Sequence, residues 1–205
     1  IVVGDSKQLP PTLFFKVNED VDLEEDLEQA TSILDEIGPY LPNHMLKWHY
    51  RSKNESLINF SNYNFYNNSL VTFPNNKVND FAIYHEYVEN GTYDRGNSRY
   101  NRNEAKKIIQ LVKKHYDTTP KKSLGIIAFS IAQQKCIHEE LEMFLFENPI
   151  YNKYINLEDN VDGFFIKNLE TVQGDERDTI LISVGYGKDN EGNFSLNFGP
   201  LNKDG

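Results

Sequence analysis

Short apolar runs recur along the chain, and each has the length of a β-strand. The run 123–129, SLGIIAF, is continuously apolar, which is typical of a strand buried on both faces of a sheet. The segment 81–88, FAIYHEYV, alternates between apolar and polar residues, the period of a strand with one solvated face. Further strands are predicted at Ile1–Val3, at the start of MLKWHYRS (45–52), at 164–170 and at 178–186.

Between these runs, apolar residues return every three or four positions, as on one face of a helix. This period extends from Leu23 to Ile37 within an acidic stretch. A second helix is predicted from Leu57 to Phe65, with Ser52 as its N-cap because Glu55 follows at the capping spacing.

The second half of the chain repeats the pattern. A third helix is predicted to begin near Asn103, and a fourth to follow Ser130, a candidate N-cap, through about Phe146. The Asn- and Pro-rich residues 67–80 and the segment 89–102 are predicted loops. Because strands alternate with helices, the predicted fold class is α/β, with a mainly parallel sheet flanked by helices on both faces.

Composition narrows the class of protein. A hydrophobic content of 39% suits a globular fold with a core, and no apolar run is long enough to cross a bilayer. The N-terminus has no signal-peptide pattern and no initiator Met, so we expect a fragment of a longer chain with no membrane partner. The lone cysteine, Cys136, cannot form an internal disulfide and is predicted to be a buried or half-buried helix thiol in a cytoplasmic protein.

The net charge of −10 argues against a free-standing nucleic-acid module, which usually carries a basic face. It leaves open a lobe that supplies only part of a nucleic-acid channel. The five histidines show no metal-ligand spacing, and the phosphate-binding sequence GxxxxGK[ST] is not present in these 205 residues.

Four stretches adjoin predicted strands and carry the candidate chemistry. They are Gly4–Pro11, Tyr50–Ser52, Ser130–Gln134 and Thr171–Asp178. Because ligands of open parallel sheets gather at the carboxyl ends of the strands, we expect these stretches to share one edge of the sheet.

Individual residues in these stretches each have a functional and a structural interpretation. The guanidinium of Arg51 suits a phosphate, although it equally suits nearby carbonyl groups. The amide of Gln8 can sense a phosphate or position a water, or it can belong to a plain turn. Gly174 lets backbone approach a ligand and Glu176 can accept bonds from ribose hydroxyls, but a charged surface turn has the same composition.

Taken in order, these stretches resemble the motifs of superfamily 1 helicases. VVGDSKQLPPT resembles motif III, WHYRSKNESLINFSNYNFYNNSL resembles the motif IV region, and LETVQGDERDTILISVGY resembles motif V. GIIAFSIAQQ is similar to a strand and turn that contact nucleic acid, and FGPLNKDG is similar to the approach to motif VI. The resemblance covers nearly the whole chain and is closest to bacterial superfamily 1B proteins related to the RNA-surveillance helicases.

This resemblance implies a RecA-like fold of the P-loop NTPase type. Residues 1–12 would end a first RecA-like domain, and 13–205 would form a second one, truncated before motif VI. The catalytic Lys and the Mg²⁺ ligands, in the Walker A and Walker B motifs, would lie upstream. The fragment alone is therefore predicted to be inactive, with ATP and Mg²⁺ as the cofactors of the intact protein.

The resemblance also assigns roles. Gln8 would contact the γ-phosphate, Tyr50 would pack near the base, and Arg51 would be the arginine finger. Two sets complete the assignment: Gly174 and Glu176 at the ATP cleft, and Ser130, Gln133 and Asn168 on the nucleic acid. Motif V often has Ser or Thr where this chain has Asn168, and Asp where it has Glu170, so its nucleic-acid contacts depart from the family pattern.

The implied activity is that of an ATP-dependent helicase or translocase on single-stranded DNA or RNA. Its partners would be that strand and the upstream RecA-like domain. The alternative is a nucleotide-gated nucleic-acid-binding or scaffolding module without unwinding activity. This alternative includes a module that is fused to a nuclease in a defence system.

Overall fold

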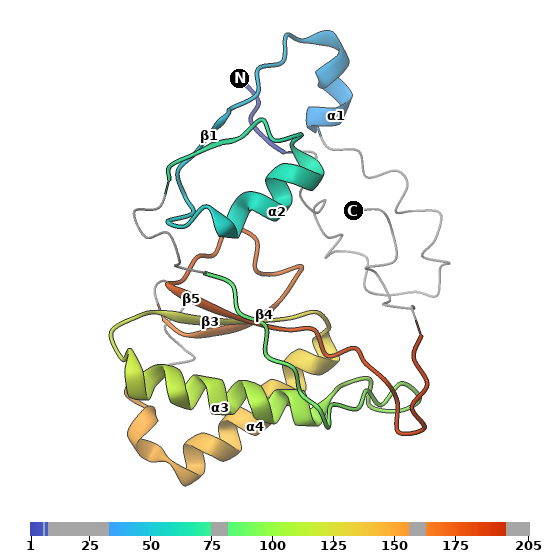
Figure 1. Cartoon of the computed structure of the whole chain (residues 1–205), viewed down its shortest axis with the longest axis vertical. Coiled ribbons are helices and arrows are strands. Elements are labelled where there is room, and N and C mark those ends of the chain that lie inside the picture. The colour runs from blue at the N-terminus through green and yellow to red at the C-terminus, as the bar shows by residue number, and fades with distance from the viewer. Residues whose placement is uncertain (6, 8–32, 75–81, 156–162, 196–205) are drawn as a thin grey trace. The chain divides into compact units, whose positions relative to one another are not determined.

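The computed structural model describes residues 1–5, 7, 33–74, 82–155 and 163–195 (Figure 1). The chain divides into two compact units, one of residues Ile1–Glu86 and one of residues Tyr87–Asp204. Each unit is described by itself. The predicted domain boundary at residues 12 and 13 falls outside the described residues and stays a prediction.

The described elements of the first unit are short. Helix α1 (Ile33–Ile37) leads into the 3-10 turn η1 (Gly38–Tyr40), and strand β1 (Trp48–His49) precedes helix α2 (Ser56–Phe65). Strand β2 (Val71–Thr72) pairs with β1 in parallel. Among the described residues of this unit, none is buried.

Several predictions for this unit can be compared with the structure. The strand within 45–52 and the helix over 57–65 are confirmed, as is the last turn of the helix predicted to end at Ile37. The loop prediction for 67–80 is wrong at β2, and the strand prediction for Ile1–Val3 is wrong. A strand requires a hydrogen-bonded neighbour, which an apolar sequence alone cannot supply.

The predicted capping role of Ser52 is also wrong. Helix α2 begins at Ser56, whose N–H is bonded to the side chain of Asn54 at 3.0 Å. The Ser52 hydroxyl instead lies 2.7 Å from Nε2 of His49, and the Ser52 N–H donates to the same nitrogen at 3.2 Å. These bonds shape the turn between β1 and α2.

The second unit contains a parallel sheet and two long helices (Figure 1). Strands β3 (Leu124–Ala128), β4 (Phe165–Asn168) and β5 (Thr179–Ser183) are arranged in the order β4-β3-β5, all parallel. Helix α3 (Arg102–Thr118) precedes β3, and helix α4 (Ile131–Glu147) with the 3-10 turn η2 (Pro149–Tyr151) connects β3 to β4. The predicted α/β fold class is confirmed.

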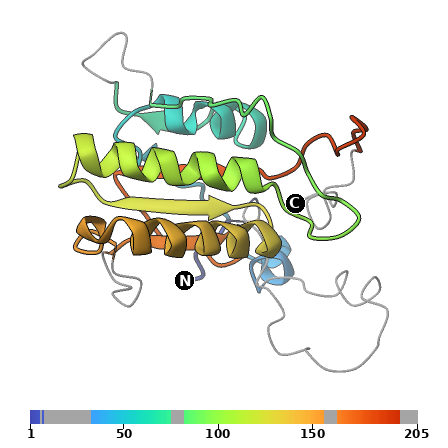
Figure 2. The ribbon, with the colours of Figure 1, turned by 90° about the horizontal axis from the view of Figure 1, so that it is seen from below.

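Both long helices cover the same face of this sheet and run side by side (Figure 2). The strand register places Ile126, Ile166 and Leu181 in one row, and this row joins the core with the apolar faces of α3 and α4. The adjacent row, Gly125, Phe165 and Ile180, points to the other face because side chains alternate along a strand. Within the described part of this unit, neither α3 nor α4 covers that second face.

The strand prediction for 81–88 is wrong, since residues 82–88 contain no strand. Its alternating pattern fits extended backbone, but no described segment pairs with it. Cys136 is a free thiol in α4 and only 1% exposed, as predicted. Burial raises the pKa of this thiol to about 11. In the described ranges, no helix combines the length and the apolar character that crossing a bilayer requires.

Candidate functional site

The predicted phosphate-binding residues of the first unit lie on the turn after β1. Tyr50 is 82% exposed, and Arg51 beside it is exposed as well. The bonds between His49 and Ser52 hold this turn, so the Arg51 side chain extends from a backbone segment of fixed conformation. Gln8 lies outside the described residues, and its contact with a phosphate stays a prediction.

A long-range bond ties the start of the chain to α2. The hydroxyl of Tyr66, at the C-cap of α2, donates to Oδ2 of Asp5 at 2.6 Å. Burial and this acceptor raise the pKa of Tyr66 to about 12. The contact fixes Asp5, the first acidic residue of the predicted phosphate-sensing stretch, within the same unit as Arg51.

Ser130 has the capping role that its sequence context predicts. It is the N-cap of α4, and its hydroxyl accepts the N–H of Gln133 at 3.1 Å. The bond satisfies one of the N–H groups that a helix leaves unpaired in its first turn. Contact between Ser130 and nucleic acid is a further role, and it stays a prediction.

Gln133 has a different setting from the one expected of a nucleic-acid contact. Its side chain is 0% exposed, so it has no surface on which a strand can lie. Its Oε1 accepts the N–H of Asn101 at 2.8 Å, and its Nε2 donates to the Asn101 carbonyl at 3.2 Å and to Oγ of Ser183 at 3.0 Å. The structure therefore gives Gln133 an internal role that joins the first turns of α3 and α4 to the end of β5.

Glu104 extends this network to the loop after β5. Its Oε1 accepts the Ser183 hydroxyl at 2.7 Å and the N–H of Gly185 at 2.9 Å. Gly185 has φ +75°, and a Cβ there would lie 3.2 Å from the Gln133 side chain, so the position favours glycine. We call Asn101, Glu104, Gln133 and Ser183 the polar network.

Sequence reasoning missed most of the polar network. Asn101 caps α3 by accepting the N–H of Glu104 at 3.1 Å, and an Asn followed three residues later by Glu is a capping signal that sequence alone offers. Ser183 has no such signal, because it reads as one more position of an apolar strand.

Asn168 organises the turn at the end of β4. It is 7% exposed, and its Oδ1 accepts the N–H groups of Glu170 at 3.1 Å and Thr171 at 3.0 Å and the Thr171 hydroxyl at 2.9 Å. A side-chain oxygen that bonds backbone two and three residues ahead is characteristic of an Asx turn. The described hydrogen bonds of the Asn168 side chain are thus within its own loop, and its contact with nucleic acid stays a prediction.

The segment from Leu169 to Asp178 crosses the uncovered face of the sheet. Nζ of Lys167 pairs with Oδ2 of Asp175 at 2.5 Å, and the Arg177 guanidinium lies over the Phe165 ring at 4.7 Å. Lys167 and Phe165 both belong to the rows that point away from α3 and α4. The segment is therefore held against β4 by an ion pair and a cation–π contact.

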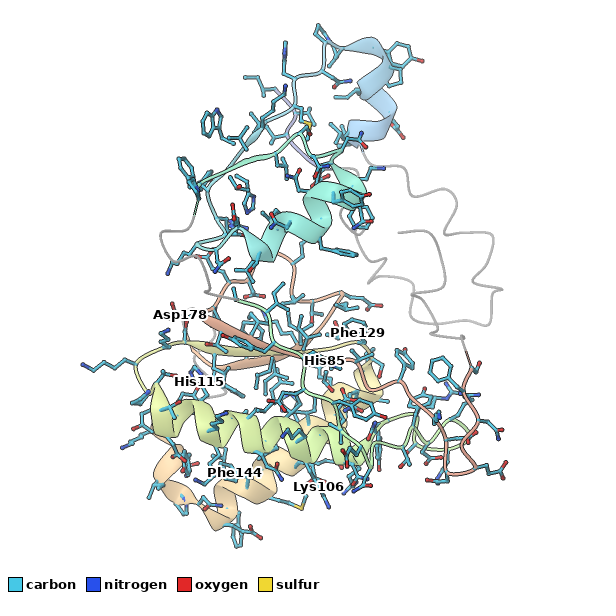
Figure 3. All side chains as sticks on the ribbon, viewed as in Figure 1. His85, Lys106, His115, Phe129, Phe144 and Asp178 are labelled. Atoms are coloured by element: carbon cyan, nitrogen blue, oxygen red, sulfur yellow. The ribbon has the colours of Figure 1, made fainter. Side chains whose placement is uncertain are left out.

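This crossing changes the expectation that the whole stretch Thr171–Asp178 lies at one edge. The segment leaves β4 at its carboxyl end, but Asp178 accepts the N–H and hydroxyl of Ser123, both at 3.0 Å, beside the start of β3. Asp178 and Phe129 accordingly mark opposite ends of the strands in Figure 3. Only the beginning of the stretch shares the edge with Ser130.

Gly174 and Glu176 lie within this crossing segment. Gly174 has φ +90°, a conformation that favours glycine, and a Cβ built there would meet nothing within 4 Å. Glu176 is exposed. The two ATP-cleft roles, of Gly174 and of Glu176, stay predictions.

The AAA domain family matches residues 23–196 of the chain. The uncharacterized ATP-dependent helicase MG140 homolog of Mycoplasma pneumoniae is 34% identical over 227 residues, covering 100% of this chain and 19% of that protein. The uncharacterized ATP-dependent helicase MG140 of Mycoplasma genitalium is 34% identical over 223 residues, with the same coverage of both chains. The chain thus spans about a fifth of the length of these curated relatives, and no solved structure matches it.

Proposed function

The chain belongs to the AAA domain family as a superfamily 1 helicase domain, and from this premise we propose that the intact cytoplasmic protein is an ATP-driven translocase on single-stranded DNA or RNA. Residues 13–205 would be its second RecA-like domain, and residues 1–12 the end of the first. ATP and Mg²⁺ would bind between the two domains, with the metal ligands upstream of this chain.

One observation carries the proposal: both curated relatives that align with the entire chain bear the name of ATP-dependent helicases. The arrangement of the second unit supports it, because Asn168 ends β4 and Ser130 lies two residues after the end of the neighbouring parallel strand β3. The edge at the carboxyl ends of the strands is where open parallel sheets bind their ligands.

Arg51 is assigned the role of the arginine finger. It is exposed on a turn defined by His49 and Ser52, so its planar guanidinium can reach a phosphate presented by another domain. Domain closure would bring it to the γ-phosphate, where it stabilises the charge that develops during transfer. Gln8 would sense the same phosphate, Tyr50 would pack near the base, and Gly174 and Glu176 would border the nucleotide.

The nucleic-acid roles divide into contact and positioning. Ser130 and Asn168 would face the strand, whereas the buried Gln133 would act through the cap it shares with Ser130. A backbone track of this kind holds a strand without reading its sequence.

The test is the steady-state ATPase rate of the full-length protein with and without single-stranded DNA and RNA. We expect stimulation by one of the strands, and a loss on the order of 10³-fold in Arg51→Ala. Arg95→Ala, a change of the same kind in the second unit, is the control and is expected to retain the wild-type rate.

Hydrolysis that is unaffected by Arg51→Ala would show that the finger assignment is wrong. An intact protein that binds ATP and nucleic acid without hydrolysis would favour the nucleotide-gated binding or scaffolding module, alone or fused to a nuclease. Residues 1–205 by themselves are expected to show no Mg²⁺-dependent hydrolysis, and robust turnover by this fragment would contradict the two-domain arrangement.

A further inference from the structure

The charge of the chain is distributed very unevenly, and its basic residues gather around α3. Residues 99–122 hold eight of the 21 basic residues and two of the 31 acidic ones, so this segment carries +6 while the rest of the chain carries −16. A basic stripe along a helix is the electrostatic signature of nucleic-acid binding, and here it stands out against an acidic background.

Four lysines of α3 lie on the part of the helix surface that does not face the core. The residues that α3 contributes to the core, among them Ala105, Val112 and Tyr116, share one face. At 3.6 residues per turn, Lys107 and Lys114 lie opposite that face, and Lys106 and Lys113 lie on the flank towards α4. Lys106, Lys113 and Lys114 are exposed, and Lys107 is half-buried.

A shallow hollow adjoins this basic face, at the N-terminal half of α3. Its lining includes Tyr87 and Asn90 from the preceding loop and Asn103, Lys106, Lys107 and Gln110 from the helix. Tyr87 is 74% exposed, and the side-chain amide of Asn103 donates to the Asn90 carbonyl, which fastens the loop to the helix. An exposed aromatic ring, side-chain amides and lysines at one place are the groups that stack on a base, bond its edge and pair with its phosphate.

The position of the hollow connects it with the edge described above. Asn101 at the start of α3 is bonded to Gln133 in the first turn of α4, and Glu104 is bonded to Gly185 after β5. The N-terminal end of α3 therefore lies at the same edge of the sheet as Ser130. A strand that passes Ser130 can continue onto the hollow and along the lysines.

We propose that this face of α3, with Lys107 and Lys114 on the phosphates and Tyr87 stacked on a base, is a second binding surface for single-stranded nucleic acid. The inference rests on the proposed function in one respect, namely that nucleic acid is the partner. It adds residues outside the motif-like stretches, and it accounts for a basic helix in an acidic chain.

The test uses the full-length protein with fluorescein-labelled oligothymidylate and oligouridylate, and binding is measured by fluorescence anisotropy over a range of KCl concentrations. The strand that the wild-type protein binds more tightly is used for the variants. In Lys107→Glu/Lys114→Glu we expect binding about tenfold weaker or more at low salt, and a salt slope smaller by about 1.4, since each phosphate contact on a single strand contributes about 0.7. Tyr87→Ala should weaken binding by about fivefold or more at every salt concentration, whereas Tyr87→Phe, which keeps the ring, should bind as the wild type does.

Lys135→Glu/Lys153→Glu is the matched control, because it makes the same change in net charge with two exposed lysines of the same unit. It is expected to bind the strand with the wild-type salt slope. Equal weakening in both double variants would show a general charge effect and overturn the surface. Unchanged binding in Lys107→Glu/Lys114→Glu would overturn it too and would indicate another partner, such as an acidic protein segment. A wild-type protein that binds no strand would instead overturn the proposed function, so the two failures are distinguishable.

Discussion

The two units of this chain differ sharply in how they treat their apolar residues. Every residue buried in the described structure belongs to the second unit, between Asn101 and Gly185. In the first unit, large apolar side chains such as Trp48, Phe60 and Phe73 are more than half exposed. The first unit is nonetheless as rich in predicted chemistry, since it carries Gln8, Tyr50 and Arg51.

This difference in burial indicates which part of the chain is stable by itself. Burial of apolar surface stabilises folds by about 25 cal/mol per Å², and the described residues of the first unit gain little of it. Its described polar contacts include the local bond between His49 and Ser52 and the long-range bond between Tyr66 and Asp5. We therefore expect the second unit to hold most of the free energy of unfolding, and the first to respond weakly to apolar substitutions.

The largest expected difference between the two units is in the free energy of unfolding lost by the same substitution, Leu to Ala, in a helix of each unit. Leu141→Ala removes a fully buried side chain of α4 and should lower the free energy of unfolding by about 2–5 kcal/mol, because a cavity is left. Leu57→Ala removes a side chain of α2 that is 47% exposed and should cost about 0.5 kcal/mol or less. Urea unfolding of residues 1–205 followed by circular dichroism measures both, and equal losses would abolish the contrast between the units.

A smaller loss of stability is expected when either of two side-chain amides is removed. Each of these amides bonds both the backbone N–H and the carbonyl of one other residue. Gln133 bonds the N–H and carbonyl of Asn101 while buried, and Asn62 bonds those of Leu70 at 3.0 and 3.1 Å while half-buried. Gln133→Met should cost about 1–3 kcal/mol, since it leaves buried polar groups unpaired, whereas water can replace the amide in Asn62→Ala at a cost of about 1 kcal/mol.

Both variants can be followed by the same urea titrations. Further evidence comes from amide hydrogen exchange, which should accelerate at Asn101 in Gln133→Met and leave the α2 amides unchanged. A Gln133→Met protein as stable as the wild type would mean that the polar network carries no net stability.

The smallest expected effect on the protein is a change in the alkylation rate of its single cysteine. Because burial raises the pKa of Cys136 from 9.0 to about 11, the folded chain holds about 100-fold less thiolate at pH 8 than an exposed cysteine would. Alkylation by iodoacetamide should be slower by at least that factor, measured by mass spectrometry. A Cys136→Ala chain with Ser61→Cys in α2 places a half-buried thiol in the first unit and should react much faster.

The same raised pKa fixes the direction of a pH dependence. The unfolded thiol ionises at a lower pH than the folded one, so stability from this group is lost as the pH rises from 9.0 towards about 11. Cys136→Ala should remove this part of the alkaline loss. Rapid alkylation of Cys136 in the native chain would show that α4 opens readily and that the second unit is less stable than the comparison implies.

Local patterns in the sequence predicted much of the second unit correctly. The apolar run of β3, the helical period of α4 and the cap at Ser130 are each decided by residues within a few positions of one another. The predictions for Ile1–Val3 and 81–88 are wrong for the complementary reason. Both have the composition of strands, but a strand forms only where another segment supplies hydrogen bonds, and no described segment does.

Some features of the candidate site could likewise be predicted from the sequence, and others could not. Sequence identified Arg51, Ser130, Asn168 and Gly174 as special, and each occupies a turn or a cap with a clear local cause. The resemblance to superfamily 1 helicases implied that Gln133 faces the nucleic acid, whereas the structure buries its side chain within the polar network. The sequence also offered no reason to connect the lysines of α3 with Tyr87, which approach each other because the loop folds back along the helix.

By itself, the sequence determined the α/β class, the caps of α3 and α4 and the resemblance to superfamily 1 helicases, because periodicity, capping and motifs are properties of neighbouring residues. Tertiary structure alone decided the polar network, whose bonds join Gln133 to Asn101 across 32 positions and Ser183 to Glu104 across 79. It also decided that the segment after β4 crosses the sheet. Such contacts depend on which elements pack together, and burial then sets whether a polar side chain meets a ligand or holds the fold.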